Sequence, residues 1–186
     1  MAGLTREHSA RQFVWNGSRF TAGIRIGRRP PRTAWAPFAR LKFSMDSATH
    51  AAFSLDPQLA RDTLPVGDLP LSRVLLMNDA NFPWLIAVPR RTGAIEIFDL
   101  DDEARELLVN EITLLAEVLK QVSACDKINI AAIGNVVAQL HVHVVARRRS
   151  DAAWPRPVWG ALPALPYEER AREQLLAAIR REIAFG

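Results

Sequence analysis

Polar and apolar residues alternate along residues 138–148, AQLHVHVVARR. Successive side chains of a β-strand point to opposite faces, so this period of two predicts a strand with two different faces. One face carries Gln139, His141, His143 and Val145, and the other carries Leu140, Val142, Val144 and Ala146. The second face is wholly apolar and has to be covered by another layer. The segment therefore predicts a sheet that packs against helices.

Apolar residues recur at helical spacing in two other segments. The first predicts a long helix that ends near Val122 and has the stripe Leu107, Leu108, Ile112, Leu115, Val118 and Leu119. Asp101 or Asp102 is its expected N-cap. The second predicts a C-terminal helix with the stripe Leu175, Leu176, Ile179 and Ile183. A short helix is expected at residues 56–63, where Asp56 precedes Pro57.

Further strands are expected at residues 53–55, 72–78, 84–89 and 127–134. The turn-rich sequence DANFP separates the second from the third of these segments and predicts a hairpin. Strands joined by hairpins and followed by a helix favour an antiparallel arrangement over a doubly wound parallel one. The expected fold is α+β, with an antiparallel sheet, one long central helix and a C-terminal helix.

The length and composition predict one domain with an ordinary hydrophobic core. The chain has 186 residues, of which 49% are hydrophobic and 24% charged, as is typical of globular proteins. No apolar run approaches the roughly 18 residues of a membrane span, and no secretory signal pattern is present. Cys125 is the only cysteine, which excludes an internal disulfide and a four-cysteine zinc site. These features predict a cytoplasmic protein without a membrane partner.

Basic residues are concentrated in the first 44 residues, which hold nine Arg or Lys side chains against one acid. The remainder carries 15 basic and 19 acidic side chains, a net charge of −4, although the whole chain has +4. Such a head is typical either of a flexible arm that binds nucleic acid or an acidic partner, or of an organelle-targeting peptide. We favour a third interpretation, in which residues 1–45 are an extension or a start-site artefact and residues 46–186 form a single domain. Nucleic acid is then expected as a partner only through the basic arm.

Three kinds of chemistry fit a strand face that presents an amide and two imidazoles. A His-x-His pair supplies two ligands for zinc or iron, but His8 and His50, the other histidines, are distant in sequence. Alternatively, one imidazole is a nucleophile and its neighbours bind an anion. The third interpretation is structural, with satisfied histidines on a half-exposed sheet. We favour the nucleophile, because such groups seldom follow one another on one face, and we expect no metal or other cofactor.

The segment QLHVHVV resembles the motif of the histidine triad (HIT) family, His-x-His-x-His-x-x with apolar x, with glutamine at the first histidine position. NDANFPWLIAVPRR resembles the family's hairpin, and KINIAAIGNVVAQLHVHVVARRRSD resembles its strand, phosphate loop and motif strand. AWPRPVWG resembles the tail of a bacterial subgroup of HIT hydrolase-like proteins. The resemblance covers most of residues 50–160 and implies a HIT-like fold, commonly a homodimer, that binds nucleotides on the motif face.

The resemblance also implies hydrolysis or transfer at the α-phosphate of a nucleoside phosphate derivative, of the dinucleoside polyphosphate or nucleoside phosphoramidate type. His141, at the middle position of the motif, corresponds to the nucleophile that forms a nucleotidyl-histidine intermediate. His143 corresponds to the residue that hydrogen-bonds the phosphoryl oxygens or the departing group. Gln139 takes the place of a residue that orients the site, but an amide cannot carry a proton.

Other residues match positions that bind the nucleotide and its phosphates: Asn129, Gly134, Asn135 and Val136. Backbone N–H groups of the turn at residues 134–136 are suited to phosphate oxygens. Trp154 and Trp159, set among prolines, are expected either to contact the ligand or dimer partner, or to pack down as hydrophobic plugs. Residues 147–149, three arginines, either attract polyphosphate or form a solvated strand end.

Two further positions depart from the family pattern. Trp84 stands where many members have a histidine, and Thr92 ends a segment that is Pro-Arg-Arg-His in the family. Two functions therefore stay open: a HIT-like hydrolase or transferase that uses His141, or a nucleotide-binding regulatory protein with little or no turnover.

Overall fold

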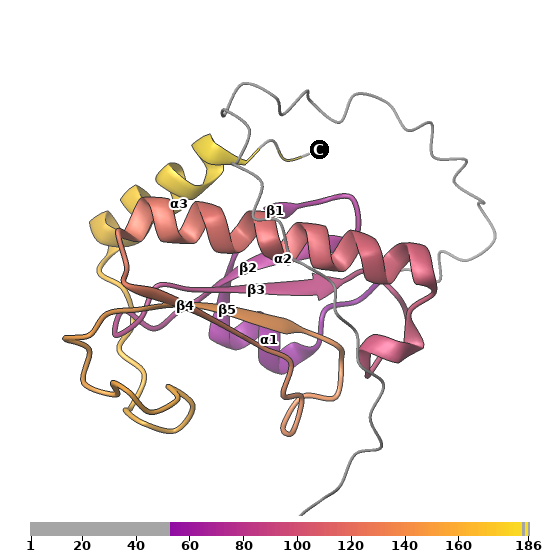
Figure 1. The fold of residues 1–186 in the computed structure, drawn as a ribbon, viewed down its shortest axis with the longest axis horizontal. Coiled ribbons are helices and arrows are strands. Elements are labelled where there is room, and N and C mark those ends of the chain that lie inside the picture. The colour runs from indigo at the N-terminus through magenta and orange to yellow at the C-terminus, as the bar shows by residue number, and fades with distance from the viewer. Residues whose placement is uncertain (1–52, 184, 186) are drawn as a thin grey trace, which may run out of the picture. The chain divides into compact units, whose positions relative to one another are not determined.

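A five-stranded antiparallel sheet forms the centre of the protein, whose computed structural model describes residues 53–183 and 185 (Figure 1). The strands are β1 (Thr63–Asp68), β2 (Ser72–Met77), β3 (Trp84–Pro89), β4 (Lys127–Ala131) and β5 (Val142–Arg147), in the spatial order β1-β2-β3-β5-β4. The helices are α1 (Pro57–Asp62), α2 (Asp102–Ser123) and α3 (Glu169–Glu182), with a short 3-10 helix, η2 (Ile97–Asp99). The predicted α+β class, antiparallel sheet, long helix and C-terminal helix are confirmed.

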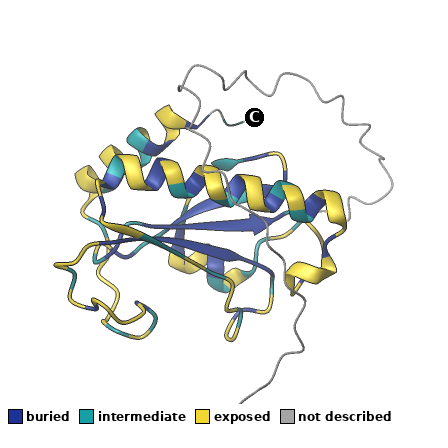
Figure 2. Ribbon diagram, viewed as in Figure 1, coloured by how far each residue is buried: buried dark blue, intermediate teal, exposed yellow. Residues whose placement is uncertain are grey.

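Helix α2 lies across one face of the sheet (Figure 1). The side chain of Asp101, its N-cap, accepts a hydrogen bond from the Ala104 N–H and so satisfies one of the unpaired donors of the first turn. Its apolar stripe packs against the apolar face of β5, as the alternation predicts. The buried residues of this layer include Leu108, Leu115, Leu119, Val142, Val144 and Ala146. Figure 2 shows the buried side of α2 turned toward the sheet and the exposed side turned outward.

The other face of the sheet is also covered, by α1 and by parts of the loops that flank β5. Leu59 from α1 and Val137, Ala153 and Val158 from the loops join Leu75, Ile86 and Val145 of the sheet in one buried cluster. All six residues of β3 and all six of β5 are consequently buried. The half-exposed sheet of the structural interpretation is therefore not found, because a second layer covers the face that carries His143.

Strand β1 was not predicted. Its sequence, TLPVGD, contains Pro65 and Gly67, which lower β-propensity in a sheet interior. Both residues are tolerated because β1 is an edge strand, and its pairing with β2 is irregular between them. The strand expected at residues 53–55 is wrong, because β1 takes the outer edge of β2 and residues 53–55 remain outside the sheet.

Two strands are shorter than the alternation predicts. Strand β4 ends at Ala131, and β5 begins only at Val142, so Gln139 and His141 precede the strand. The Leu140 N–H donates to the carbonyl of Ala94, which draws this part of the chain away from the sheet ladder. The predictions for residues 1–45, and for His8 and His50, lie outside the described residues.

Candidate active site

His141 and His143 lie together on the sheet face that α1 covers. His143 is the register partner of Ile86 on β3, whose side chain belongs to the cluster under α1. The centroids of the two imidazole rings are 4.8 Å apart, at an interplanar angle of 84°. Each histidine is only 6% exposed. The predicted pair is therefore formed, although His141 belongs to the loop and not to the strand.

The tautomer of His141 follows from its hydrogen bond. Its Nδ1 lies 2.6 Å from the backbone carbonyl oxygen of Gln139. A carbonyl oxygen only accepts hydrogen bonds, so Nδ1 carries the hydrogen and donates. In the neutral ring the lone pair is then on Nε2, which is the arrangement that a nucleophilic imidazole needs.

His143 has the opposite tautomer. The indole Nε1–H of Trp84 donates to Nδ1 of His143 over 3.0 Å. An indole nitrogen only donates, so Nδ1 of His143 is the acceptor and the hydrogen of the neutral ring is on Nε2. Burial, with a smaller contribution from His141, lowers the pKa of His143 from 6.5 to about 4. At neutral pH this ring is therefore an uncharged donor.

Only one of the two predicted loop tryptophans contacts the histidines. The ring of Trp159 lies 5.5 Å from those of His143 and Trp84, and the Trp84 ring lies 5.2 Å from His143. The Trp154 ring instead lies against the guanidinium groups of Arg147 and Arg149, at 5.7 Å and 6.0 Å. Two indoles thus enclose His143 and help to exclude water from it.

The side chain of Gln139 does not join the imidazoles as the strand prediction expects. Its Oε1 accepts from the Asp56 N–H, and its Nε2 donates to the Ser54 carbonyl, both over 2.9 Å. These two backbone groups flank Leu55, so the amide binds the main chain there as a neighbouring strand would. Gln139 therefore orients His141 through its carbonyl and holds the segment before α1 through its side chain.

The predicted phosphate-binding residues are divided between β4 and the following loop. Asn129 on β4 accepts a hydrogen bond from Arg147 through Oδ1, so this oxygen is already engaged. The loop contains Gly134, at φ +65°, then Asn135 and the 92%-exposed Val136. Of these side chains, none that the structure describes hydrogen-bonds to either imidazole.

Arg147 is not a solvated strand end. It is 1% exposed, and its guanidinium forms an ion pair with Asp151 at 2.8 Å. The prediction that it attracts polyphosphate is therefore wrong for this arginine, because its donors are used inside the protein.

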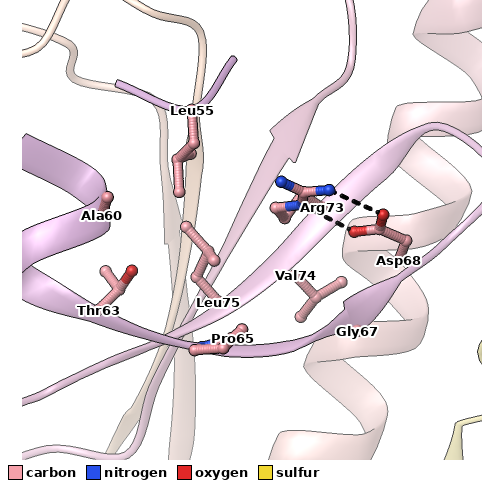
Figure 3. A pocket seen from close by; sticks show the side chains of 9 residues that line it. All are labelled: Leu55, Ala60, Thr63, Pro65, Gly67, Asp68, Arg73, Val74 and Leu75. Carbon is pink, nitrogen blue, oxygen red and sulfur yellow. Dashed lines mark hydrogen bonds and ion pairs between the residues drawn. The ribbon is translucent and has the colours of Figure 1, made fainter. Parts of the chain in front are cut away.

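Two features of this face could not be read from the strand pattern. One is the bond from Trp84 to His143, for which the signal was the tryptophan at a position that is often histidine. The other is a hollow of about 530 Å³ between α1 and strands β1 and β2. Figure 3 shows its lining, which includes Leu55, Thr63, Pro65 and Leu75 and the ion pair of Asp68 with Arg73.

This hollow lies on the face that carries the histidines. Leu75 is the register partner of Ile86, and Ile86 is the partner of His143. Two strand spacings, about 10 Å, therefore separate the hollow from His143. A smaller hollow of about 370 Å³ lies at the opposite edge, lined by residues 127–131 of β4 together with Pro155, Pro157 and Trp159.

Within residues 53–183 and 185, no three His, Cys, Asp or Glu side chains are grouped so that they could hold a metal ion. In the same part of the chain, no helix has both the length and the apolar character needed to cross a membrane.

Comparison with known proteins identifies the family. Residues 59–150 match the model of the HIT domain. A histidine triad protein from Bradyrhizobium japonicum is 51% identical, with a TM-score of 0.70, over 71% of this chain and 98% of that one. Together with this sheet and histidine pair, that similarity shows that the chain belongs to the histidine triad family, as its motif predicts.

Two other crystal structures agree. A histidine triad protein from Sinorhizobium meliloti 1021 is 45% identical, with a TM-score of 0.70 and the same coverage of 71% and 98%. One from Marinobacter aquaeolei VT8 is 42% identical, with a TM-score of 0.68, over 70% of this chain and 95% of that one. No curated protein matches the sequence.

Proposed function

We propose that the protein is a nucleotide-binding hydrolase or nucleotidyl transferase that cleaves at the α-phosphate of a nucleoside phosphate derivative through His141. Proteins of the HIT family are usually hydrolases or transferases that act on nucleotides. The observation that carries the proposal is the 2.6 Å bond from His141 Nδ1 to the Gln139 carbonyl. It leaves the lone pair on Nε2 and holds the ring against rotation.

The proposed reaction has two displacements. The Nε2 lone pair of His141 attacks the α-phosphorus, the bond to the departing group breaks, and a nucleotidyl-histidine forms. Water or another acceptor then attacks the same phosphorus, the P–N bond breaks and its electron pair returns to Nε2, and the proton of the attacking group passes to solvent. Phosphoryl transfer mainly needs an aligned nucleophile and donors for the phosphoryl oxygens. Nε2–H of His143 and the backbone N–H groups of residues 134–136 are the donors that we assign to this role.

The nucleoside is expected to occupy the hollow between α1 and β2. Its volume of about 530 Å³ lies within the range of small-molecule sites, roughly 300–1,000 Å³. Leu55 and Leu75 give it apolar walls, and the Asp68 carboxylate adds an acceptor for hydroxyl groups. The side-chain amide of Gln139 binds the backbone on both sides of Leu55, so Gln139 supports this wall of the hollow in addition to orienting His141.

A nucleotide-binding regulatory protein with little or no turnover is the second candidate. The 6% exposure of each imidazole favours it, because the reacting nitrogen must meet a phosphate. The replacement of the first histidine of the motif by Gln139 favours it as well, since the amide cannot move a proton.

Incubation with diadenosine polyphosphates and adenosine 5′-phosphoramidate separates the two functions. We expect turnover by the wild type, loss of turnover in His141→Ala, and a nucleotide covalently attached to His141 after rapid acid quenching. His8→Ala, a histidine substitution outside residues 59–150, is the matched control and is expected to keep the activity. Binding without turnover in the wild type supports the regulatory function, and turnover that survives His141→Ala contradicts the proposal.

The proposal includes a homodimer formed at the β4 edge of the sheet. Strand β4 pairs on one side with β5 and leaves its other side open among the described strands. Ile130, Ile133 and Val136 in and after this strand are 48%, 41% and 92% exposed. An open edge with exposed apolar residues is a surface on which a second chain packs. Sedimentation velocity tests this, and a monomer at all concentrations contradicts it.

A further inference from the structure

The bond between Trp84 and His143 determines what His143 can give to a substrate. The indole N–H occupies Nδ1, so the neutral imidazole presents only its Nε2–H. A neutral imidazole donates a hydrogen bond through this group, but it does not release the proton near pH 7. To act as a general acid the ring must first become an imidazolium.

The protonated form of His143 is disfavoured by its surroundings. An imidazolium carries hydrogens on both nitrogens, so its Nδ1–H would face the Nε1–H of Trp84, donor against donor. The rings of Trp84 and Trp159 also take the place of water around it. The lowered pKa of His143 agrees with this geometry.

No other group around the two histidines takes the place of His143 as a general acid. Nδ1–H of His141 is bonded to the Gln139 carbonyl, and His141 Nε2 is the attacking atom. The amide of Gln139 and the indole of Trp159 do not ionise near pH 7. Within the described residues, no carboxylate, ammonium or guanidinium group hydrogen-bonds to either imidazole.

We propose, on the basis of the function assigned to His141 above, that the site selects substrates whose departing group leaves as a stable phosphate anion, namely phosphate, a polyphosphate or a nucleoside phosphate, over substrates that release an amine. Trp84 is the positioning residue that sets this preference, because it keeps His143 in the neutral tautomer with its hydrogen on Nε2.

The electron balance of the first step explains the preference. With a polyphosphate substrate, the P–O bond breaks and its electron pair goes to the bridging oxygen, which leaves as part of a phosphate anion. The hydrogen bond from His143 Nε2–H stabilises the developing charge. With a phosphoramidate, the same electron pair goes to nitrogen, which leaves as an amine only if it receives a proton. The geometry supplies no such proton.

The test compares kcat/KM for diadenosine triphosphate with kcat/KM for adenosine 5′-phosphoramidate. General acid catalysis contributes about 100-fold or more, so we expect the wild type to prefer the polyphosphate by at least about 100-fold. Trp84→Phe keeps a ring and removes the N–H, which allows His143 to become protonated, and is expected to reduce the preference at least about tenfold. Trp159→Phe is the matched control, because the Trp159 Nε1–H has no hydrogen-bond partner within the described residues and a phenyl ring keeps the cover over His143, and it is expected to leave the preference unchanged.

Imidazole ¹⁵N chemical shifts give a readout that does not depend on turnover. In the wild type we expect His143 Nδ1 to remain unprotonated from pH 8 to about pH 5, and we expect Trp84→Phe to shift the titration to higher pH. Protonated Nδ1 at pH 7, or equal use of both substrates by the wild type, overturns the proposal. If the shifts are as expected but neither substrate is turned over, the proposed function fails and the leaving-group preference fails with it, while the tautomer assignment stands.

Discussion

Arg147 is the least exposed charged residue in the part of the chain that the structure describes, at 1%. Its Nε and Nη2 atoms donate to the two carboxylate oxygens of Asp151 over 2.8 and 3.0 Å, and Nη1 donates to Asn129. Phe82 and Trp154 lie beside its guanidinium at 5.8 and 5.7 Å. This group connects β4, β5 and the loop that carries the tryptophans.

Asp151→Asn is expected to lower the free energy of unfolding by about 3–5 kcal/mol, because it leaves a buried guanidinium without its counter-charge. Hydrogen bonds from Arg147 lower the pKa of Asp151 below 3.8, so the pair is ionised at neutral pH. The side chain of Asp151 is 9% exposed, and water therefore screens the pair little. Since domains typically have about 5–15 kcal/mol of stability in total, the loss is a large share.

Urea denaturation followed by tryptophan fluorescence measures this loss. The matched control is Asp102→Asn, which breaks an ion pair with Arg105 in which the aspartate side chain is 96% exposed. Exposed pairs contribute about 0–1 kcal/mol, so the control is expected to lose about 1 kcal/mol or less. Equal losses in the two variants would refute the argument from burial. Arg147→Met combined with Asp151→Asn is expected to cost less than the sum of the single losses, because neither charge then lacks its partner.

Two further predictions concern the histidines and Gln139. The unfolded chain protonates His143 near pH 6.5 and the folded protein only near pH 4. As the pH is lowered from 6.5 to 4, the free energy of unfolding is therefore expected to fall by about 1.4 kcal/mol per pH unit. His143→Asn removes this contribution. Urea denaturation at pH 7 and pH 5 gives the change in the free energy of unfolding with pH, and an equal change in the wild type and in His143→Asn would contradict the prediction. Gln139→Ala loses two hydrogen bonds to residues 54 and 56, and is expected to cost about 1–3 kcal/mol and to raise KM more than it lowers kcat. Gln121→Ala, on the exposed face of α2, is the control, and it is expected to leave the free energy of unfolding and the KM within error of the wild type. Hydrogen exchange at residues 53–56 is expected to increase in Gln139→Ala and not in the control.

The secondary-structure elements were largely predictable because they depend on local patterns. The stripe from Leu107 to Leu119 predicts α2, and the alternation through His143 predicts β5 and its apolar face. Side-chain direction along a strand or helix is a local property of the backbone. Strand β1 could not be predicted in this way, because Pro65 and Gly67 are acceptable only at the edge of a sheet. Whether a strand lies at an edge depends on how the whole sheet is assembled and not on local sequence.

The sequence by itself determined the α+β fold, the family and the closeness of His141 to His143, all of which follow from spacing within one short segment. Only the tertiary structure decided the chemical state of the site. The partner of His143 is Trp84, 59 residues away, and the partners of the Gln139 side chain are 83 and 85 residues away. Hydrogen-bond partners at such separations depend on how the whole chain packs. The tautomers and the buried environment that set the proposed chemistry could therefore be read only once the fold was known.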